Sequence, residues 1–220
     1  MKNIRPEAFI FDMDSTLAET GAIWNSAIDR LLAVIDHRRD DEIERLSAGK
    51  KAEDVAIALH AFLKPELPLS ECKPILRDAL IDTFNRYPSV EVPGAVKMLY
   101  RLHGRVPMAV ASGSPIKGIG ITIDHLGVSQ LFDLLLSSED MERGKPSPDI
   151  FLATAERLGV APEKCLVFED SLVGVEAATA AGMNSVVRPN THSEGIGEIA
   201  TRLVTSWDEV TVESIFLNES

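Results

Sequence analysis

The sequence predicts an α/β protein: a Rossmann-like parallel sheet core with helices on both faces, interrupted by an inserted all-α cap domain. Three observations predict this fold class. Residues 8–11 form a short apolar run that ends at an aspartate, as a strand buried on both faces would. Residues 18–88 carry apolar side chains at helical spacing, with no convincing strand. From Gly94 onward, strand-like and helix-like segments alternate, which is typical of βαβ units.

The elements of the core follow one another in regular order. We predict helices over 95–103, 116–126, 148–158 and 173–181, and strands over 106–111, 131–136, 165–168 and 185–187. Ser147 is expected to cap the helix that Pro148 begins. We assign residues 1–17 and 89–220 to the core and residues 18–88 to the cap domain. Ligands of open α/β sheets bind beyond the carboxyl ends of the strands, so an insertion there would lie over the site as a lid.

The composition fits this arrangement and limits the partners. The chain has 220 residues, 45% of them apolar and 25% charged, which is enough for a core plus a small lobe. A net charge of −12 argues against nucleic acid, because a phosphate backbone requires a basic surface. The two cysteines form no zinc-binding pattern, and we expect reduced thiols in a cytoplasmic protein. The first apolar run is too short for a signal peptide or membrane span, so we expect no membrane partner.

Four polar clusters follow predicted strands of the core. They are residues 12–16, 112–114, 144–146 and 169–171. Parallel topology would bring them to one edge of the sheet. Four carboxylates would then share one cleft: Asp12, Asp14, Glu169 and Asp170. Two unit charges at ~4 Å repel by about 4 kcal/mol at an effective dielectric of 20. A cation would relieve this repulsion, and oxygen ligands without histidine suit Mg²⁺.

The remaining polar groups suit a phosphate ester. Lys145 adds a fixed positive charge, while Ser112 and Gly113 offer a hydroxyl and backbone N–H groups. Asp12 can attack phosphorus in line and form an aspartyl-phosphate. Asp14 can protonate the leaving oxygen and then accept a proton from the water that cleaves the intermediate. Each cluster alone is equally well explained as a turn or a helix cap, but the joint pattern indicates a magnesium-dependent phosphohydrolase.

The motifs resemble those of the haloacid dehalogenase superfamily, in its β-phosphoglucomutase-like phosphatase branch with a helical cap. They stand here as FIFDMDSTL (9–17), VASGSP (110–115), RGKPSPDIF (143–151) and VFEDSLVGVEAATAAGM (167–183). The resemblance implies a role for each matching residue: Asp12 as nucleophile, Asp14 as acid/base, Ser112 and Lys145 as phosphate ligands, and Asp12, the Asp14 carbonyl, Asp170 and Glu169 as the Mg²⁺ ligand set.

The sequence departs from that family pattern at three positions. Ser15 stands where the family usually has glycine, and we expect it to contact the phosphate. The mutases carry a cap histidine and a cap arginine, whereas the matching positions here hold Trp24 and Ala52. These replacements favour a phosphatase of small phosphorylated metabolites, with sugar phosphates as one candidate class, over a sugar phosphomutase.

The cap is expected to select the substrate. Our candidates are Trp24, Gly49, Lys50 and Lys51. Core packing and solvated surface are the competing explanations for such side chains on a helical lobe. The five histidines, His37, His60, His103, His125 and His192, fall outside every motif and receive no role. We expect a monomer or a weak homodimer.

Three other classes fit the sequence less well. Dehalogenases of the superfamily need no metal and lack the second aspartate, whereas this chain has Asp14 and Asp170. Phosphorelay receivers are shorter and carry their phosphorylated aspartate after the third strand, whereas Asp12 follows the first. A catalytically silent binding protein would not need the intact set of carboxylates and lysine.

Overall fold

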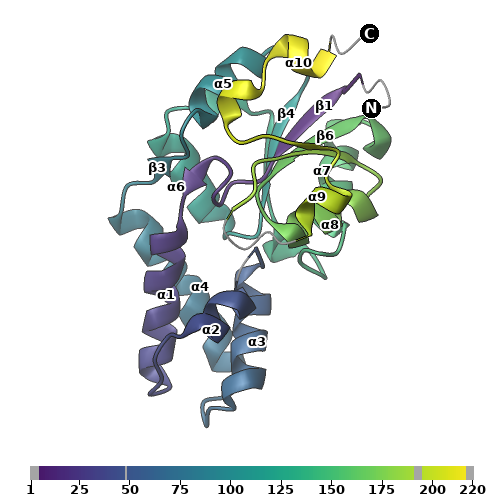
Figure 1. The fold of residues 1–220 in the computed structure, drawn as a ribbon. Helices are drawn as coiled ribbons and strands as arrows, with labels where there is room; N and C mark the ends of the chain where they lie inside the picture. The colour runs from purple at the N-terminus through teal and green to yellow at the C-terminus, as the bar shows by residue number, and fades with distance from the viewer. Residues whose placement is uncertain (1–4, 48, 191–194, 217–220) are drawn as a thin grey trace.

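A computed structural model describes residues 5–47, 49–190 and 195–216. The chain forms a lobe built on a sheet and a second lobe of helices that extends from one edge of it (Figure 1). The described strands of the main sheet run in the order β5-β4-β1-β6-β7-β8, and each neighbouring pair is parallel. They are β1 (Ala8–Phe11), β4 (Met108–Ser112), β5 (Leu134–Ser137), β6 (Cys165–Glu169), β7 (Asn184–Val187) and β8 (Arg202–Leu203). The predicted parallel α/β core is confirmed.

Helices cover both faces of this sheet, and the alternation of side chains along β1 explains how. Phe9 and Phe11 pack into the cluster that includes α5 (Ala95–Leu102) and α6 (Ile116–His125). Ala8 and Ile10 pack on the other face, against α7 (Asp149–Leu158) and α8 (Leu172–Ala180). All four residues of β1 are fully buried, which is why the strand reads as a continuous apolar run. The strand therefore delivers Asp12 to the centre of the sheet edge.

Short helices complete this lobe. They are η1 (Ser129–Leu131), η2 (Ser138–Asp140), η3 (Pro162–Lys164), α9 (Ile196–Ile199), η4 (Trp207–Glu209) and α10 (Val212–Phe216). One local expectation was wrong. The Ser147 hydroxyl does not cap α7 but donates to the Asp149 carboxylate at 2.5 Å, and Pro148 takes the N-cap position without a side-chain bond.

The helical lobe consists of α1 (Gly21–Val34), α2 (Asp41–Ser47), α3 (Ala52–Leu63) and α4 (Leu69–Arg86). Two short strands, β2 (Ala18–Glu19) and β3 (Val90–Glu91), pair antiparallel where the chain leaves and re-enters the sheet lobe. Our prediction of no strand within 18–88 was therefore wrong at β2, because two residues are too few to show a period. The domain boundaries at 17/18 and 88/89 stay a prediction, and they fall beside this pair. None of the helices in the described ranges has the length and apolar character needed to cross a membrane.

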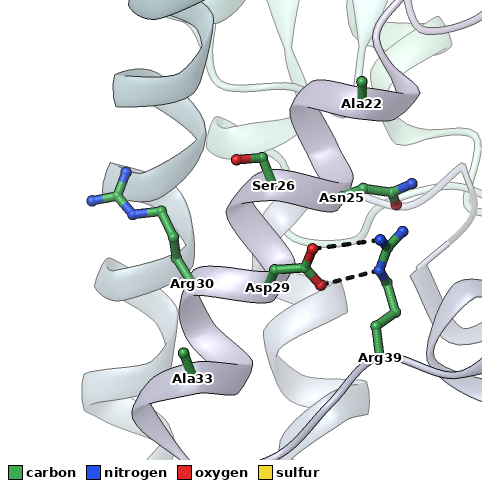
Figure 2. Close-up of a pocket in the computed structure, with 7 residues that line it drawn as sticks. All are labelled: Ala22, Asn25, Ser26, Asp29, Arg30, Ala33 and Arg39. Carbon is green, nitrogen blue, oxygen red and sulfur yellow. Dashed lines mark hydrogen bonds and ion pairs between the residues drawn. The ribbon is translucent and has the colours of Figure 1, made fainter.

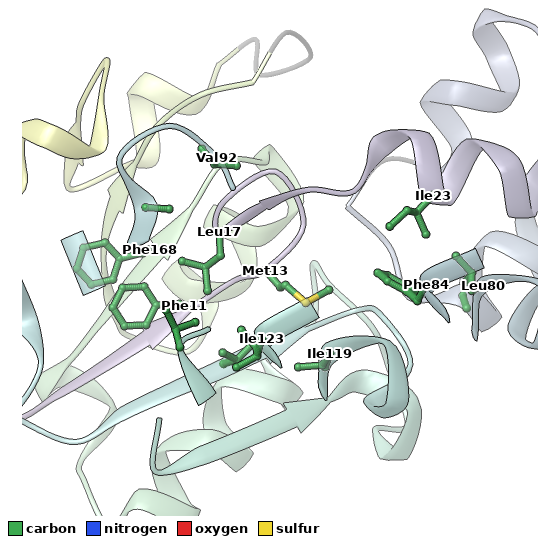
Figure 3. Packing of buried hydrophobic residues seen from close by; sticks show 14 of the residues in the cluster. Phe11, Met13, Leu17, Ile23, Leu80, Phe84, Val92, Ile119, Ile123 and Phe168 are labelled. Atoms are coloured by element: carbon green, nitrogen blue, oxygen red, sulfur yellow. The ribbon is translucent and has the colours of Figure 1, made fainter. Parts of the chain in front are cut away.

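Apolar packing joins the two lobes. Ile23, Leu80 and Phe84 of the helical lobe belong to the same buried cluster as Ile119 and Ile123 of α6 (Figure 3). A close approach occurs at Gly118 of α6, where a Cβ would lie 2.6 Å from the ring of Phe84. Glycine therefore allows α4 and α6 to pack here at a distance that alanine would prevent.

Two glycines of α6 test this contact. We expect Gly118→Ala to lower the free energy of unfolding by about 1–3 kcal/mol, because the buried Phe84 ring has no room to move. Gly120, two residues along, has nothing within 4 Å of an added Cβ. Gly120→Ala should raise the free energy of unfolding by up to about 1 kcal/mol, since alanine is the better helix former. Urea denaturation measures both, and equal stability of the two variants would contradict the proposed contact.

Candidate active site

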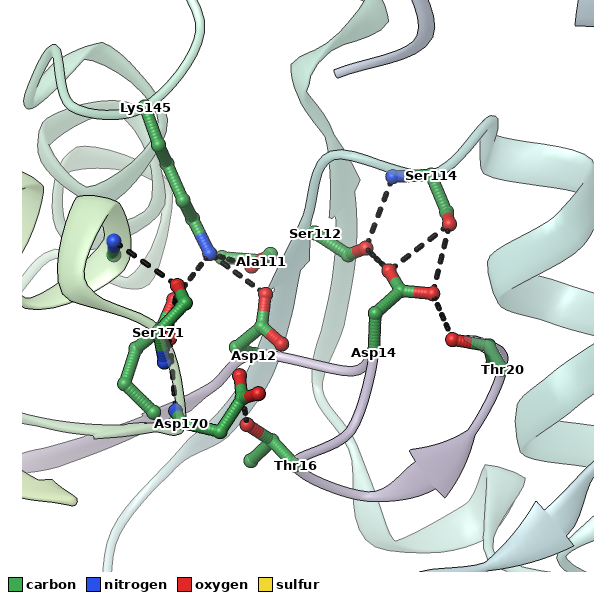
Figure 4. A network of polar contacts seen from close by, with 12 residues as sticks. Asp12, Asp14, Thr16, Thr20, Ala111, Ser112, Ser114, Lys145, Asp170 and Ser171 are labelled. Carbon is green, nitrogen blue, oxygen red and sulfur yellow. Dashed lines mark hydrogen bonds and ion pairs between the residues drawn. The ribbon is translucent and has the colours of Figure 1, made fainter. Parts of the chain in front are cut away.

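The loop after β1 separates Asp12 and Asp14. The backbone N–H groups of Leu17 and Ala18 donate to the Met13 carbonyl at 2.9 and 3.0 Å, which forms a tight turn. Within it, Ser15 has a φ of 60°, a left-handed conformation that favours glycine. Serine is accommodated at this position, although a glycine would adopt the conformation with less strain. The two aspartates consequently point to different parts of the site (Figure 4).

Lys145 is a buried cation between two carboxylates. Its ammonium donates to Asp12 Oδ1 at 2.7 Å and to Glu169 Oε1 at 2.6 Å, and the residue is only 4% exposed. Burial by itself lowers the pKa of Lys145, but the charges of Asp12 and Glu169 outweigh burial and raise the pKa above its ordinary value. Lys145 therefore stays charged, and the predicted convergence of residues 12, 145 and 169 is present.

Glu169 is the most enclosed of the acids. While Oε1 accepts from Lys145, Oε2 accepts from the backbone N–H groups of Asp170 and Ser171 at 2.9 and 3.0 Å. A Cβ at Gly174, in the first turn of α8, would overlap this carboxylate. Gly174 thus lets Glu169 lie against the amino end of the helix, where a negative charge is stabilised. The sequence motif contained this glycine, but its role was visible only in the structure.

Asp170 completes an acidic cluster. It accepts from Asn190 Nδ2 at 2.7 Å and from Thr16 Oγ1 at 3.3 Å. Asp12, Glu169 and Asp170 each offer an oxygen within 4.8 Å of the other two, and all three are buried. Sequence reasoning missed Asn190 and Thr16, because Asn190 lies outside the motifs and a threonine inside one had no distinguishing signal.

The charges of this cluster shift its proton affinities. Burial, followed by the nearby carboxylates, raises the pKa of Asp12 well above its usual range despite the opposing effect of Lys145. Burial and then Glu169 raise the pKa of Asp170 to about 8. A hard divalent cation would stabilise the ionised form of these crowded carboxyl groups. The residues present therefore fit Mg²⁺.

Asp14 lies on the other side of Asp12, toward the helical lobe. Three hydroxyls donate to its carboxylate, those of Thr20 at 2.5 Å, Ser112 at 2.7 Å and Ser114 at 2.9 Å (Figure 4). The indole Nε1 of Trp24 is a fourth donor, at 3.0 Å. The Ser112 hydroxyl, which we predicted to bind phosphate, is thus directed to Asp14 in this structure. Trp24, predicted to select substrate, reaches the same carboxylate from α1. Thr20 and Ser114 were not predicted.

A cavity of about 280 Å³ lies between the two lobes. It is lined by Asp12, Asp14, Ser15, Thr20, Gly21, Trp24, Asn25, Ile28, Glu44, Ser47, Gly49, Lys50, Gly113, Asp170, Ser171 and Asn190. It therefore contains Asp12, Asp14 and Asp170, two of the four predicted phosphate residues and three of the four predicted cap residues. Ser112, Lys145, Glu169 and Lys51 do not line it.

The loop that follows α2 packs directly on the core. Gly49 has a φ of 68°, and a Cβ there would lie 2.5 Å from Val173 Cγ2. A Cβ at Gly113 would lie 2.9 Å from the Lys50 carbonyl oxygen. Both glycines therefore act in close packing between the lobes, in addition to lining the cavity.

Lys51 differs from our expectation of a substrate contact. Its side chain is 3% exposed, and its ammonium donates to the Met141 carbonyl at 2.8 Å and the Glu142 carbonyl at 3.4 Å. It therefore joins the helical lobe to the core, and Lys50 is the lysine that reaches the cavity. Of the histidines, His37, His60, His103 and His125 are absent from the cavity wall, and His192 lies outside the described residues.

Comparisons with known proteins agree with this geometry. A sequence model described as haloacid dehalogenase-like hydrolase matches residues 6–182. The chain belongs to the haloacid dehalogenase-like hydrolase family. This hydrolase is 33% identical over 186 residues to the fructose-1-phosphate phosphatase YqaB of Escherichia coli, covering 83% of this chain and 96% of the relative. It is 30% identical over 181 residues to a phosphorylated carbohydrates phosphatase of Thermotoga maritima, covering 82% and 83% of the two chains.

The fold of this hydrolase is shared with solved structures. A β-phosphoglucomutase from Clostridium difficile superposes with a TM-score of 0.83 at 24% identity, covering 96% of this chain and 95% of the other. This likeness concerns the fold alone. The curated relatives are both named as phosphatases, and phosphatases of this family generally use a divalent metal, which the cluster of Asp12, Glu169 and Asp170 fits.

The raised pKa values of Asp12 and Asp170 predict how binding of a divalent cation such as Mg²⁺ would stabilise this hydrolase. The folded-state pKa values of Asp12 and Asp170 lie above the unfolded value, so their contribution to stability is full below about pH 4 and is lost as pH rises through the folded pKa. Mg²⁺ would replace these protons, so its increase in Tm should be larger near pH 8.5 than near pH 5. At [Mg²⁺] 100 times Kd the gain is about 2.7 kcal/mol.

Differential scanning fluorimetry across pH, with and without Mg²⁺, measures this effect. Asp170→Asn serves as the control, because it removes one of the charges that the cation would neutralise, and its response to Mg²⁺ should be much smaller. An equal Tm increase at both pH values in the wild-type protein would contradict the assignment of the cluster.

Proposed function

We propose that this hydrolase is a Mg²⁺-dependent phosphatase of small phosphorylated metabolites that acts through an aspartyl-phosphate on Asp12. One observation carries the proposal. Asp12 shares a buried site with a charged lysine and two further acids, and this site forms the floor of a cavity that the helical lobe covers. Such an arrangement suits attack on a phosphate ester shielded from bulk water.

The first half-reaction uses the two oxygens of Asp12 differently. Oδ1 accepts from Lys145, which leaves Oδ2 to attack phosphorus. As the Oδ2–P bond forms, the bond from phosphorus to the ester oxygen breaks, and the leaving oxygen takes a proton from the Asp14 carboxyl. Lys145 can stay hydrogen-bonded to Oδ1, which becomes the carbonyl oxygen of the aspartyl-phosphate. When bound, the divalent cation would be held by Asp12, Asp170, the Asp14 carbonyl and Glu169, and would neutralise charge between the nucleophile and the phosphate.

The second half-reaction regenerates the enzyme. Asp14, now a carboxylate, accepts a proton from the water that attacks phosphorus, and the Oδ2–P bond breaks to release inorganic phosphate. The surrounding hydroxyls of Thr20, Ser112 and Ser114 can rotate to donate or accept as Asp14 gains and loses its proton. The Ser112 hydroxyl and the backbone N–H groups at Ser15 and Gly113 are our candidates for holding the phosphate oxygens.

The nucleophile assignment is tested by phosphate release from a panel of esters with and without Mg²⁺. We expect Asp12→Asn to lower the rate at least about 10³-fold, because the amide is a poor nucleophile. Asp14→Asn should lower it by about 10²–10⁴-fold, the usual contribution of a general acid/base. Asp78→Asn is the matched control, since this aspartate is 73% exposed on α4. Wild-type rates in Asp12→Asn would end the nucleophile assignment.

Sugar phosphomutase is the alternative function. It is favoured by the shared fold with a β-phosphoglucomutase. Against it, Trp24 and Ala52 stand where the mutases carry a histidine and an arginine, and Ala52 is a buried residue without charge. Neither side chain supplies the cation expected for a second phosphate.

The two functions differ in their response to a bisphosphorylated sugar. We expect steady release of inorganic phosphate from sugar monophosphates, with no activation by a sugar bisphosphate and no isomerised sugar phosphate in the products. Phosphate assay and ³¹P NMR of the same reaction measure both quantities. Activation by the bisphosphate together with an isomerised product would favour the mutase.

The substrate class and setting complete the proposal. The two relatives are named for fructose 1-phosphate and for phosphorylated carbohydrates, which supports sugar phosphates here. The net charge of −12 supports the proposal that neither nucleic acid nor an anionic membrane surface is a partner. A cytoplasmic monomer or weak homodimer remains our proposal for the state of the protein.

A further inference from the structure

We propose that Glu44 makes the far end of the cavity selective for a neutral, hydroxyl-bearing leaving group and against a second phosphate. The inference rests on the proposed phosphatase function and assigns a specificity-determining residue to the same cavity. Glu44 comes from α2 in the helical lobe, lines the cavity and is 46% exposed at its side chain. It belongs to none of the motifs that carry the phosphate chemistry.

The position of Glu44 follows from the direction of α1. Trp24, near the amino end of α1, contacts Asp14, and Ile28 lines the cavity one helical turn later. A rise of about 1.5 Å per residue puts Ile28 roughly 6 Å farther along α1 than Trp24. Glu44 is joined through Arg39 to Asp29, which follows Ile28. Glu44 therefore lies at the level where a leaving group of several carbons would end.

An ion-pair triad fixes the Glu44 carboxylate in this place. Arg39 Nε donates to Asp29 Oδ1 at 3.0 Å and Nη2 donates to Oδ2 at 3.4 Å (Figure 2). The third guanidinium nitrogen, Nη1, donates to Glu44 Oε1 at 3.3 Å. The triad carries two carboxylates and one guanidinium, hence a net charge of −1. Within the described residues, Glu44 Oε2 has no hydrogen-bond partner, so this oxygen is available to a ligand.

The neighbours of Glu44 favour hydroxyl groups. Asn25 and Ser47 also line the cavity, although the Ser47 hydroxyl donates to the Ile43 carbonyl at 2.7 Å, and Ile28 adds apolar surface. A carboxylate accepts hydrogen bonds from alcohols strongly and has nothing to donate to a phosphate. The nearby cation is Lys50. Its backbone carbonyl packs on Gly113, one of the residues that we expect to bind the phosphate. The far end therefore favours O–H donors and repels a second anionic group.

Charge-neutral replacement of Glu44 is the direct test. We expect Glu44→Gln to lower kcat/KM for fructose 1-phosphate about tenfold and to raise it for fructose 1,6-bisphosphate about tenfold, because the acceptor is weakened and the repulsion is removed. The kcat/KM for p-nitrophenyl phosphate should change less than twofold, because its leaving group has no further hydroxyl group to donate to Glu44. Glu42→Gln is the matched control: Glu42 lies on the same helix, pairs with Arg45 outside the cavity, and should leave all three substrates unchanged.

A second variant separates charge from position. Arg39→Gln keeps the Glu44 charge but removes the triad, so kcat/KM for fructose 1-phosphate should fall while fructose 1,6-bisphosphate stays a poor substrate. An unchanged preference of Glu44→Gln for the monophosphate would overturn this inference. Hydrolysis of p-nitrophenyl phosphate by the same variant would still support the proposed phosphatase function. A wild-type protein that hydrolysed none of the three esters would overturn both.

Discussion

The buried ammonium of Lys145 between Asp12 and Glu169 is the interaction on which the rest of the site depends. A buried cation is tolerated only with compensating charge, and crowded carboxylates are tolerated only with a cation. The three residues come from three separate parts of the chain, so the contact requires β1 to lie beside β6, and the loop containing Lys145 to close over both. The same contact also requires the parallel strand order of the sheet and Gly174, which leaves space for the Glu169 carboxylate.

Asp12 and Asp14 are two residues apart but lie in different surroundings. Asp12 is bound by an ammonium, and burial, followed by the neighbouring acids, raises the pKa of its carboxyl, which a divalent cation would offset. Asp14 is turned to the cap side and held by hydroxyls and the indole N–H of Trp24. Their different chemical roles therefore follow from surroundings that a tight turn separates, since the two side chains are chemically identical. The indole links that turn to the helical lobe, because Trp24 belongs to α1.

The sequence predicted the parts of the site that obey a rule of topology. Asp12 directly follows β1, Glu169 ends β6 and Asp170 follows it, and Lys145 lies in a loop at the same sheet edge, so their convergence followed from strand–helix alternation. Contacts that depend on side-chain packing could not be predicted from the sequence. Lys50 and Lys51 are adjacent and identical, yet Lys50 lines the cavity whereas Lys51 is buried against the Met141 and Glu142 carbonyls. Likewise β2 was missed, because two residues carry no periodicity.

Close packing between the two lobes fixes where the side chains of the cap lie relative to the phosphate end of the cavity. Gly49 and Gly113 pack closely where the loop after α2 meets the core, Gly144 faces the Asp54 carboxylate of α3, and Lys51 adds hydrogen bonds between the lobes. The loop is thereby held against the phosphate end of the cavity, while α1 and α2 extend away from it. A cap side chain such as Glu44 can discriminate leaving groups only if its distance from phosphorus is fixed. Selectivity at the far end therefore depends on the glycines that set the packing of the lobes at the near end.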